Sequence, residues 1–263
     1  PFNALGIGWN IHNEPFMKGS VFSRLKIRAS TGLTGSVSFS PYMAQTTYSY
    51  YTSNWYATGA GAIVNNYGNN NLEWQQTRDN DLGMEIGFMH DRLLIMPRYY
   101  YKYTKGLIAD VTLPPSTGFS SYKDNIGNMR NTGWELNFQY GVISNKNFNL
   151  NLTANLVHNK NVIVKISDAL KAYNNRADQA QTDAENVGAP LLHYQEGQSI
   201  NTIYAVKSLG IDPENGREIY VKKDGTLTYD WSADDIVPVG NPDPKVEGYF
   251  GSSIRYRQFN VTF

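Results

Sequence analysis

The feature that most constrains this chain is a strict two-residue alternation of apolar with polar or small side chains. In one such segment, Trp134, Leu136 and Phe138 are separated by Glu135 and Asn137. The same pattern recurs at residues 25–34, 82–88, 148–156 and 246–256. Successive side chains of a β-strand point to opposite faces. The alternation therefore predicts many strands that each have one apolar and one polar face.

The composition supports an all-β fold. The chain is 13% aromatic and contains 19 Tyr and 23 Gly among its 263 residues, which suits strands and turns better than helices. The mean hydropathy of -0.46 and the lack of an apolar run near 18 residues exclude a helical membrane protein. They do not exclude a membrane barrel, whose strands are apolar only at every second position.

The lengths of the predicted connections alternate between short and long. We predict eight strands, near residues 5–12, 21–34, 72–88, 93–104, 130–142, 148–164 and 245–256, and one that begins near Phe259. The connections after the second, fourth and sixth strands are long and cover about 36–71, 105–129 and 165–244. Outer-membrane barrels have short turns on one side and long extracellular loops on the other. The predicted fold is therefore an antiparallel transmembrane β-barrel segment of about eight strands.

Four local features refine this prediction. Pro97 interrupts the fourth strand and predicts a bulge or a locally unpaired edge. A short helix is expected around Asp168–Asn174. Two strand-like runs at 203–209 and 217–221 flank a turn and predict a hairpin outside the barrel wall, and residues 223–225 predict a second turn.

Motifs for catalysis, metal binding or nucleic-acid binding are not found. The 23 basic and 23 acidic residues cancel, which gives no global field for nucleic acid, and the chain has no Cys. The four histidines lie at positions 12, 90, 158 and 193 and form no zinc-binding spacing. The acidic pairs at 79/81 and 234/235 are interpreted as lumen lining or loop caps, and the turn at 212–216 as a plain turn rather than a calcium loop. We therefore predict no enzyme activity, no metal and no cofactor.

An ordered series of segments is similar to the C-terminal half of SusC/RagA-type TonB-dependent outer-membrane transporters. The segments are GWNIHNEPFM at 8–17, LKIRASTGLTG at 25–35, NNNLEW at 69–74, IGFMHDRLLIMPRYYYKYTKGLI at 86–108, LPPSTGFSSYKDNIGNMRNTGWELNFQY at 113–140, IYAVKSLGIDPENGREIYVKKDG at 203–225 and DDIVPVGNPDPKVEGYFGSS at 234–253. Together they cover nearly the whole chain. Pro97 and the tyrosine-rich segment 36–71 depart from the family pattern.

The resemblance implies a roughly 22-stranded outer-membrane barrel with an N-terminal plug. It further implies a SusD-like surface lipoprotein that closes over the barrel, a glycan or oligopeptide substrate, and energy from TonB, which engages a segment before the plug. The plug, the TonB-contacting segment and the last strands are expected outside the 263 residues. Two other functions stay open: a passive or structural outer-membrane barrel, and a soluble carbohydrate-binding β-domain whose apolar faces meet in a sandwich core.

Aromatic side chains are the candidate contacts to the substrate or to the lipoprotein lid. The central candidates in the segment 36–71 are Tyr50, Tyr51, Trp55 and Tyr56, and Phe119 and Tyr122 are added from the next long connection. Tyr and Trp can stack on sugar rings and pack against a protein at a low entropic cost. The alternative is that these rings only pack the loops against their neighbours.

Overall fold

The computed structural model describes residues 2–36, 40–112, 118–119, 121–182 and 193–263. The strands are β1 (Ala4–Asn10), β2 (Phe22–Ser36), β3 (Thr47–Tyr56), β4 (Gly59–Asn66), β5 (Gln75–Phe88), β6 (Leu93–Thr112), β7 (Ser121–Ser144), β8 (Phe148–Ile166), β9 (Ile203–Ile211), β10 (Glu218–Val221), β11 (Leu227–Thr228), β12 (Ile236–Gly240), β13 (Glu247–Tyr256) and β14 (Phe259–Thr262). One α-helix, α1 (Asp168–Thr182), follows β8, and short 3-10 turns lie at Ile11–Asn13, Pro15–Met17, Pro41–Ala44 and Ala233–Asp235.

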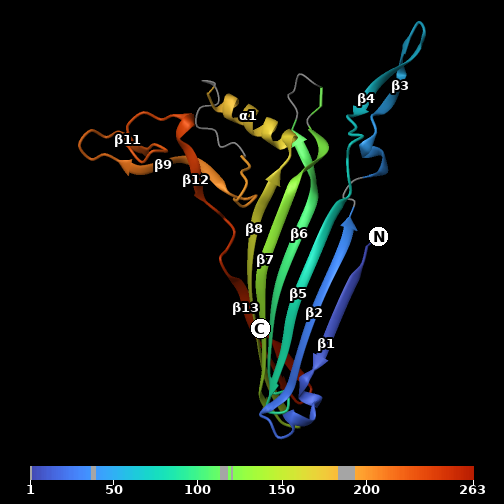
Figure 1. Cartoon of the computed structure of the whole chain (residues 1–263), viewed down its shortest axis with the longest axis vertical. Coiled ribbons are helices and arrows are strands. Elements are labelled where there is room, and N and C mark those ends of the chain that lie inside the picture. The colour runs from blue at the N-terminus through green and yellow to red at the C-terminus, as the bar shows by residue number, and fades with distance from the viewer. Residues whose placement is uncertain (1, 37–39, 113–117, 120, 183–192) are drawn as a thin grey trace.

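The eight predicted strands form one antiparallel sheet in the order β1-β2-β5-β6-β7-β8-β13-β14. Every pairing in this sheet is antiparallel, and strands that follow each other along the sheet also follow each other in sequence apart from the inserted elements. Figure 1 shows a long, curved wall with the short turns at one end and α1, β3, β4 and β9–β12 at the other. The sheet is a segment of a barrel wall and does not close on itself, as the sequence predicts.

One face of the sheet carries apolar side chains from all eight strands. The pairing brings Ile95, Phe138, Ala154 and Phe250 into one row that crosses four strands. This face is open to the surroundings: Phe250 is 90% exposed and Leu82 is 50% exposed. Within the described residues, no second sheet covers it, so the sandwich core of the soluble alternative is not formed. An exposed apolar face of this kind is the outer, lipid-facing surface of a membrane barrel.

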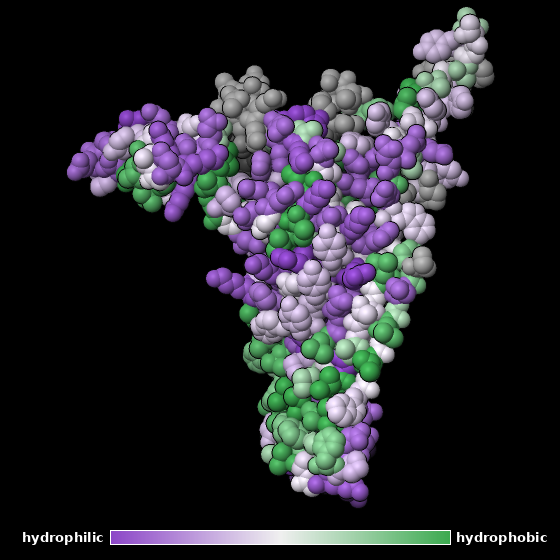
Figure 2. Space-filling view, viewed as in Figure 1, coloured by the Kyte–Doolittle hydropathy of each residue, from purple (hydrophilic) through white to green (hydrophobic). Residues whose placement is uncertain are grey.

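The apolar face ends at a sharp boundary along the strands. On β7 the outward apolar run extends from Trp134 to Val142, which is nine residues, and a membrane-spanning strand needs about 9–11. The boundary row is Ala29, Leu82, Tyr99, Trp134 and His158. Figure 2 shows the change along the molecule, with hydrophobic residues gathered near the end with the short turns and hydrophilic residues at the other end. Tyr99 and Trp134 at the boundary fit an interfacial aromatic belt.

The opposite face of the sheet carries ion pairs. Arg98 pairs with Asp81 and, at 3.2 Å from Nη1 to Oε2, with Glu135. The other pairs are Lys102 with Asp79 at 3.3 Å, Arg24 with Asp91 at 2.7 Å, and Arg24 and Lys26 with Glu85 at 3.7 and 3.8 Å. The acidic side chains at 79 and 81, predicted to line a lumen, therefore neutralise bases on the polar face.

The turn between β5 and β6 is strained and held by side chains. Met89, His90 and Asp91 have φ angles of 55°, 58° and 63°, a region that side-chain-bearing residues rarely adopt. Asp91 accepts hydrogen bonds from the Ser23 hydroxyl at 2.8 Å and from Arg24 at 2.7 Å, and its backbone N–H donates to Ser23 Oγ at 2.9 Å. Burial raises the pKa of Asp91, but these hydrogen bonds and the Arg24 charge outweigh it and leave the pKa below its ordinary value.

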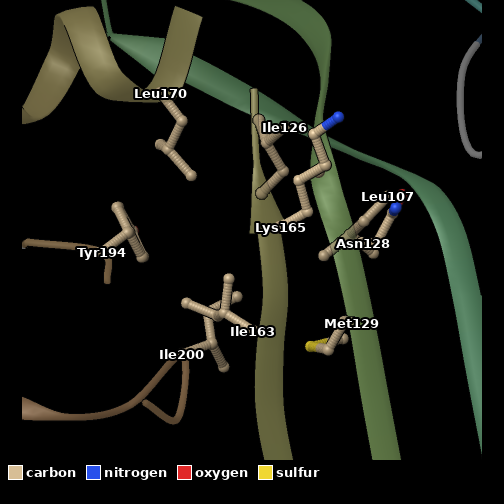
Figure 3. Close-up of a pocket in the computed structure, with 10 residues that line it drawn as sticks. Leu107, Ile126, Asn128, Met129, Ile163, Lys165, Leu170, Tyr194 and Ile200 are labelled. Atoms are coloured by element: carbon tan, nitrogen blue, oxygen red, sulfur yellow. The ribbon is translucent and has the colours of Figure 1, made fainter. Parts of the chain in front are cut away.

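A small apolar core holds α1 on the upper ends of β6, β7 and β8. It consists of Val111, Ile126, Ile163, Ile166 and Leu170. Figure 3 shows Leu170 descending from the helix toward the strands, with Tyr194 and Ile200 beside it. The residues around this core leave only about 10 Å³ of free space, so it is packing and not a binding site. Among the described residues, no helix is long and apolar enough to cross a membrane.

Two smaller sheets lie beyond the wall. One has the order β11-β10-β9-β12, and the hairpin predicted outside the wall is its β9–β10 pair. The turn predicted at 223–225 is confirmed, since Gly225 has a φ of 86° and its N–H donates to the Lys222 carbonyl. The other sheet is the hairpin β3–β4, which the sequence analysis left inside a loop.

The predicted boundaries of two regions are wrong, and one of the two interpretations of Pro97 is also wrong. Residues 105–112 and 121–129, expected in a long loop, belong to β6, which ends at Thr112, and to β7, which begins at Ser121. The helix expected around Asp168–Asn174 continues to Thr182. Pro97 causes no bulge: it pairs in register with Leu136, and the pairing with β5 is interrupted next to it without a shift of register. The locally unpaired interpretation is confirmed, because proline has no N–H to donate to the ladder.

Replacement of Phe250 with Arg should lower the free energy of unfolding of the full-length protein in lipid vesicles, and so destabilise it, by about 2–4 kcal/mol. Phe250 lies in the middle of the apolar band, where a charged side chain on the lipid face is most costly. The matched control is Tyr249→Arg, on the opposite face of the same strand, which should cost about 0.5 kcal/mol. Urea-induced unfolding measures both values, and equal losses would contradict the assignment of the faces.

Candidate functional site

The six candidate contacts fall into two groups, both at the end of the wall that carries the long connections. Tyr50, Tyr51, Trp55 and Tyr56 lie on β3, in the hairpin that projects beyond the wall (Figure 1). Phe119 and Tyr122 lie at the connection between β6 and β7. The structure thus divides the single predicted set of aromatic contacts between two surfaces.

The hairpin β3–β4 exposes most of its tyrosines. Tyr50 and Tyr56 are each 73% exposed and Tyr51 is 43% exposed. Trp55 pairs through its backbone with Ala60, and its side chain lies outside the described part of the structure. An isolated two-stranded ribbon is only marginally stable in water. Within the described residues, Tyr50 and Tyr56 are open to contact, and the alternative that these rings pack the loop against its neighbours stays open.

The second group forms the wall of an open cleft. The rings of Phe119 and Tyr122 lie 5.9 and 6.0 Å from the ring of Tyr67, the latter pair edge to face. The cleft has a volume of about 710 Å³, and its other lining residues are Gly68, Asn69, Asn70, Asn71 and Asp124. We refer to these eight residues as the aromatic cleft.

Hydrogen bonds fix the polar side of the aromatic cleft. Asn69 donates from Nδ2 to Asp124 Oδ1 at 3.0 Å and to the Lys123 carbonyl at 3.1 Å, and its Oδ1 accepts from the Asn71 N–H at 3.0 Å. The Tyr122 hydroxyl donates to Asp124 Oδ2 at 3.2 Å. Asn125 joins the two connections, because it donates to the carbonyls of Glu73 and Gly106 at 3.0 and 2.8 Å. The Asp124 carboxylate is therefore engaged by neighbours on both oxygens.

The cleft and the hairpin share an uncharged sequence. Residues 29–72 contain no Asp, Glu, Lys, Arg or His, although charged residues make up 17% of the chain. The segment includes β3, β4, Tyr67 and Asn69–Asn71. The segment 29–72 therefore offers ring stacking and amide hydrogen bonds rather than ion pairs, and Asp124 is the one charged residue among the eight that line the aromatic cleft.

Sequence reasoning missed Tyr67, the asparagines and Asp124 as site residues. Tyr67 was visible as one aromatic among many, and nothing in the sequence links it to Phe119, which is 52 positions away. Its position directly after β4 and before the run of three asparagines is the one local signal that could have found it.

The other polar groups considered from the sequence serve the fold. His12 and His158 each contact a backbone carbonyl through Nδ1, and the His193 ring lies 5.1 Å from that of Tyr204. In the turn after β9, the Asp212 carboxylate accepts a hydrogen bond from the Tyr229 hydroxyl, which lowers the pKa of Asp212. Asp235 accepts from the Lys223 N–H at 3.1 Å. Within the described residues, no cluster of three potential metal ligands occurs.

Comparisons with known proteins give a consistent family. A family model described as TonB dependent receptor-like, beta-barrel matches residues 4–260. The TonB-dependent receptor P3 of Formosa agariphila is 29% identical over 275 residues, which cover 99% of this chain and 27% of that protein. The TonB-dependent receptor SusC of Bacteroides thetaiotaomicron is 27% identical over 278 residues, covering 100% of this chain and 27% of that protein.

Solved structures share the fold. A chain in the structure of the RagAB peptide transporter superposes with a TM-score of 0.78 at 24% identity, covering 99% of this chain and 28% of the other. In the closed-closed state of the RagAB peptide importer the TM-score is 0.75 at 23% identity, covering 99% of this chain and 28% of the other. The chain spans about a quarter of the length of the curated relatives it matches.

Replacement of Asn69 with Ala should loosen the polar side of the aromatic cleft. It removes two donated bonds and one accepted bond, one of them to a carboxylate, which together are worth about 1–3 kcal/mol of local stability. Hydrogen exchange at the amides of residues 69–72 should accelerate by about tenfold or more. Asn70→Ala is the matched control, because Asn70 lines the same cleft without a hydrogen bond in the described structure, and a similar acceleration there would contradict the role of Asn69.

Proposed function

Because this chain belongs to the TonB-dependent receptor-like β-barrel family, we propose that it forms part of the wall of an outer-membrane barrel that imports its substrate with energy supplied through TonB. The observation that carries this proposal is the sheet with one exposed apolar face and one ion-paired polar face. The resemblance to SusC/RagA-type transporters predicted from the sequence is confirmed by the same family and by SusC among the relatives.

The 263 residues are in this proposal one part of a larger barrel. The edge strands β1 and β14 each pair on one side only in the sheet. Unpaired strand edges are not tolerated in lipid, so further strands must continue the wall. The plug and the segment that contacts TonB belong to other parts of the full protein, and the long connections face the outside of the cell.

The substrate of the proposed import is a glycan or an oligopeptide. The aromatic cleft supports both classes, because its rings can stack on a sugar ring or a peptide side chain and its amides can bond to hydroxyl or peptide groups. One relative is the TonB-dependent receptor SusC, and one of the solved structures is that of the RagAB peptide transporter. The uncharged segment 29–72 together with the Asp124 carboxylate disfavours an anionic ligand at this position.

A surface lipoprotein of the SusD type is the proposed partner. The exposed rings of β3 support this, since Tyr-rich and Ser-rich surfaces without charge are typical of protein-binding loops that gain their affinity from rigid aromatic contacts. In this arrangement the hairpin contacts the lid, and the aromatic cleft contacts the substrate beneath it.

Uptake tests the import proposal. Substitution of both Tyr67 and Tyr122 by Ala in the full-length protein should reduce uptake of a labelled neutral oligosaccharide or peptide by about 5–30-fold, equivalent to about 1–2 kcal/mol of lost ring contacts. Tyr101→Ala, on the outer face of the wall, is the control and should leave uptake unchanged. Uptake that persists without TonB would contradict active import and favour the passive barrel.

Co-purification tests the partner. Replacement of Tyr50, Tyr51 and Tyr56 by Ser should weaken retention of the lipoprotein by at least about tenfold, because three exposed rings are removed. The matched control in the same hairpin is Thr47→Ala, Ser49→Ala and Thr58→Ala, which removes hydroxyls and keeps the rings. Retention by the unaltered protein should persist from low to high salt, since the hairpin has no charge to screen. Loss of the complex in high salt would argue against contact through this hairpin.

A further inference from the structure

The outward face of the wall carries basic side chains directly above the apolar band. Two cross-strand rows follow the boundary row on the side of the long connections. The first row is Thr31, Asn80, Tyr101, Thr132 and Lys160, and the second is Leu33, Arg78, Tyr103, Arg130 and Val162. These ten side chains include three bases and no acid. We call Arg78, Arg130 and Lys160 the basic patch.

The bases of this patch have no acidic partner among the residues that the structure describes. Within the described residues, Arg78, Arg130 and Lys160 form no ion pair. Arg130 also has a buried Nε without a hydrogen-bond partner there. The acidic side chains at the neighbouring levels of the wall lie on the opposite face, where each pairs with an inner base: Asp79, Asp81, Glu85 and Glu135. The charges of the wall are therefore segregated, with net positive charge left on the outer face.

The register brings the three bases within reach of one ligand. Arg78 on β5 and Arg130 on β7 flank Tyr103 on β6, so their backbones are about 10 Å apart, two strand spacings. Lys160 is two residues from the direct partner of Arg130, a diagonal position about 7–8 Å away. Arginine presents a fork that matches phosphate oxygens, and lysine supplies a further point charge.

The height of the basic patch along the membrane normal matches the height of the lipid headgroup layer. Strands of a membrane barrel tilt by about 40°, so two residues along a strand rise by about 5 Å. Lys160 is thus about 5 Å, and Arg78 and Arg130 about 10 Å, above the last apolar row. The headgroup layer occupies about 5–8 Å on each side of the hydrocarbon core, and long basic side chains can lean toward it.

We propose that the basic patch binds the phosphate of an anionic lipid headgroup in the leaflet that faces the long connections. The inference rests on the membrane location in the proposed function and adds a ligand site outside the barrel lumen. Tyr101 and Tyr103 lie between the bases and pack at the level where aromatic rings favour the membrane interface. The ligand is recognised by its phosphate charge and by an acyl portion that continues down the apolar band.

Native mass spectrometry of the full-length protein tests this, with phosphatidylglycerol, phosphatidylcholine and inorganic phosphate as probes. The unaltered protein should retain phosphatidylglycerol in preference to phosphatidylcholine. The triple variant Arg78→Gln, Arg130→Gln, Lys160→Gln should bind phosphatidylglycerol at least about tenfold more weakly, since each base near an anionic surface contributes about fivefold. The matched control is Lys207→Gln, Lys222→Gln, Lys223→Gln, which removes three exposed charges from the outlying sheet and should change nothing.

Each outcome decides the proposal. Equal retention by the triple variant, or equal binding of both lipids by the unaltered protein, would overturn it. Competition by inorganic phosphate at millimolar concentration would also overturn it, because it would indicate a site for a free anion. If the triple variant does not fold, the single variants Arg78→Gln, Arg130→Gln and Lys160→Gln replace it, and each should weaken phosphatidylglycerol binding by about fivefold. Import is not measured here, so lipid binding and TonB-dependent uptake can fail independently.

Discussion

The structure depends on one constraint: in lipid, each backbone N–H and C=O must find its partner on a neighbouring strand. Antiparallel pairing continues from β1 to β14 and meets this requirement across eight strands, apart from a gap beside Pro97. Pro97 shows what happens where one backbone donor is missing. It has no N–H, and the ladder toward β5 is interrupted beside it, yet the pairing with Leu136 on β7 continues in register. The strand keeps its alternation, so a single missing donor does not move any side chain to the wrong face.

The same alternation sorts charge as well as hydrophobicity. Acidic side chains of the wall lie on the polar face, where Arg98 bridges Asp81 and Glu135 across three strands. On this face Tyr100 is buried against Gly133, and a Cβ at 133 would lie 2.5 Å from the tyrosine oxygen, so glycine is required there. Such local neutralisation keeps the polar face free of a strong field of one sign. Arg78, Arg130 and Lys160 lie on the outer face, where lipid headgroups neutralise them in the proposed lipid site.

The sequence predicted the wall better than its upper end, for physical reasons. Strands in the membrane must alternate, so their period is visible without a structure. Above the boundary this requirement ends: β6 and β7 continue through Gly106 and Gly127, whose φ angles of 65° and 142° accompany register shifts, and the alternation is lost. The hairpin β3–β4 was missed because Tyr, Ser and Thr occupy both of its faces. The aromatic cleft combines Tyr67 with Phe119 and Tyr122 from two connections, and a single sequence contains no signal for such a contact.

The extension of β6 and β7 beyond the boundary row places the aromatic cleft far from the basic patch, so that the electrostatic interaction between them is weak. From Arg130 to Tyr122 on β7 is eight residues, or about 20 Å along the membrane normal for a strand tilted by about 40°. Charges interact weakly beyond about 8 Å at physiological ionic strength, so the basic patch does not attract anions into the aromatic cleft. In the proposed function, selection in the cleft depends on its own rings, amides and the Asp124 carboxylate. The long strands raise the aromatic cleft well above the basic patch, so that each proposed site would select its ligand independently.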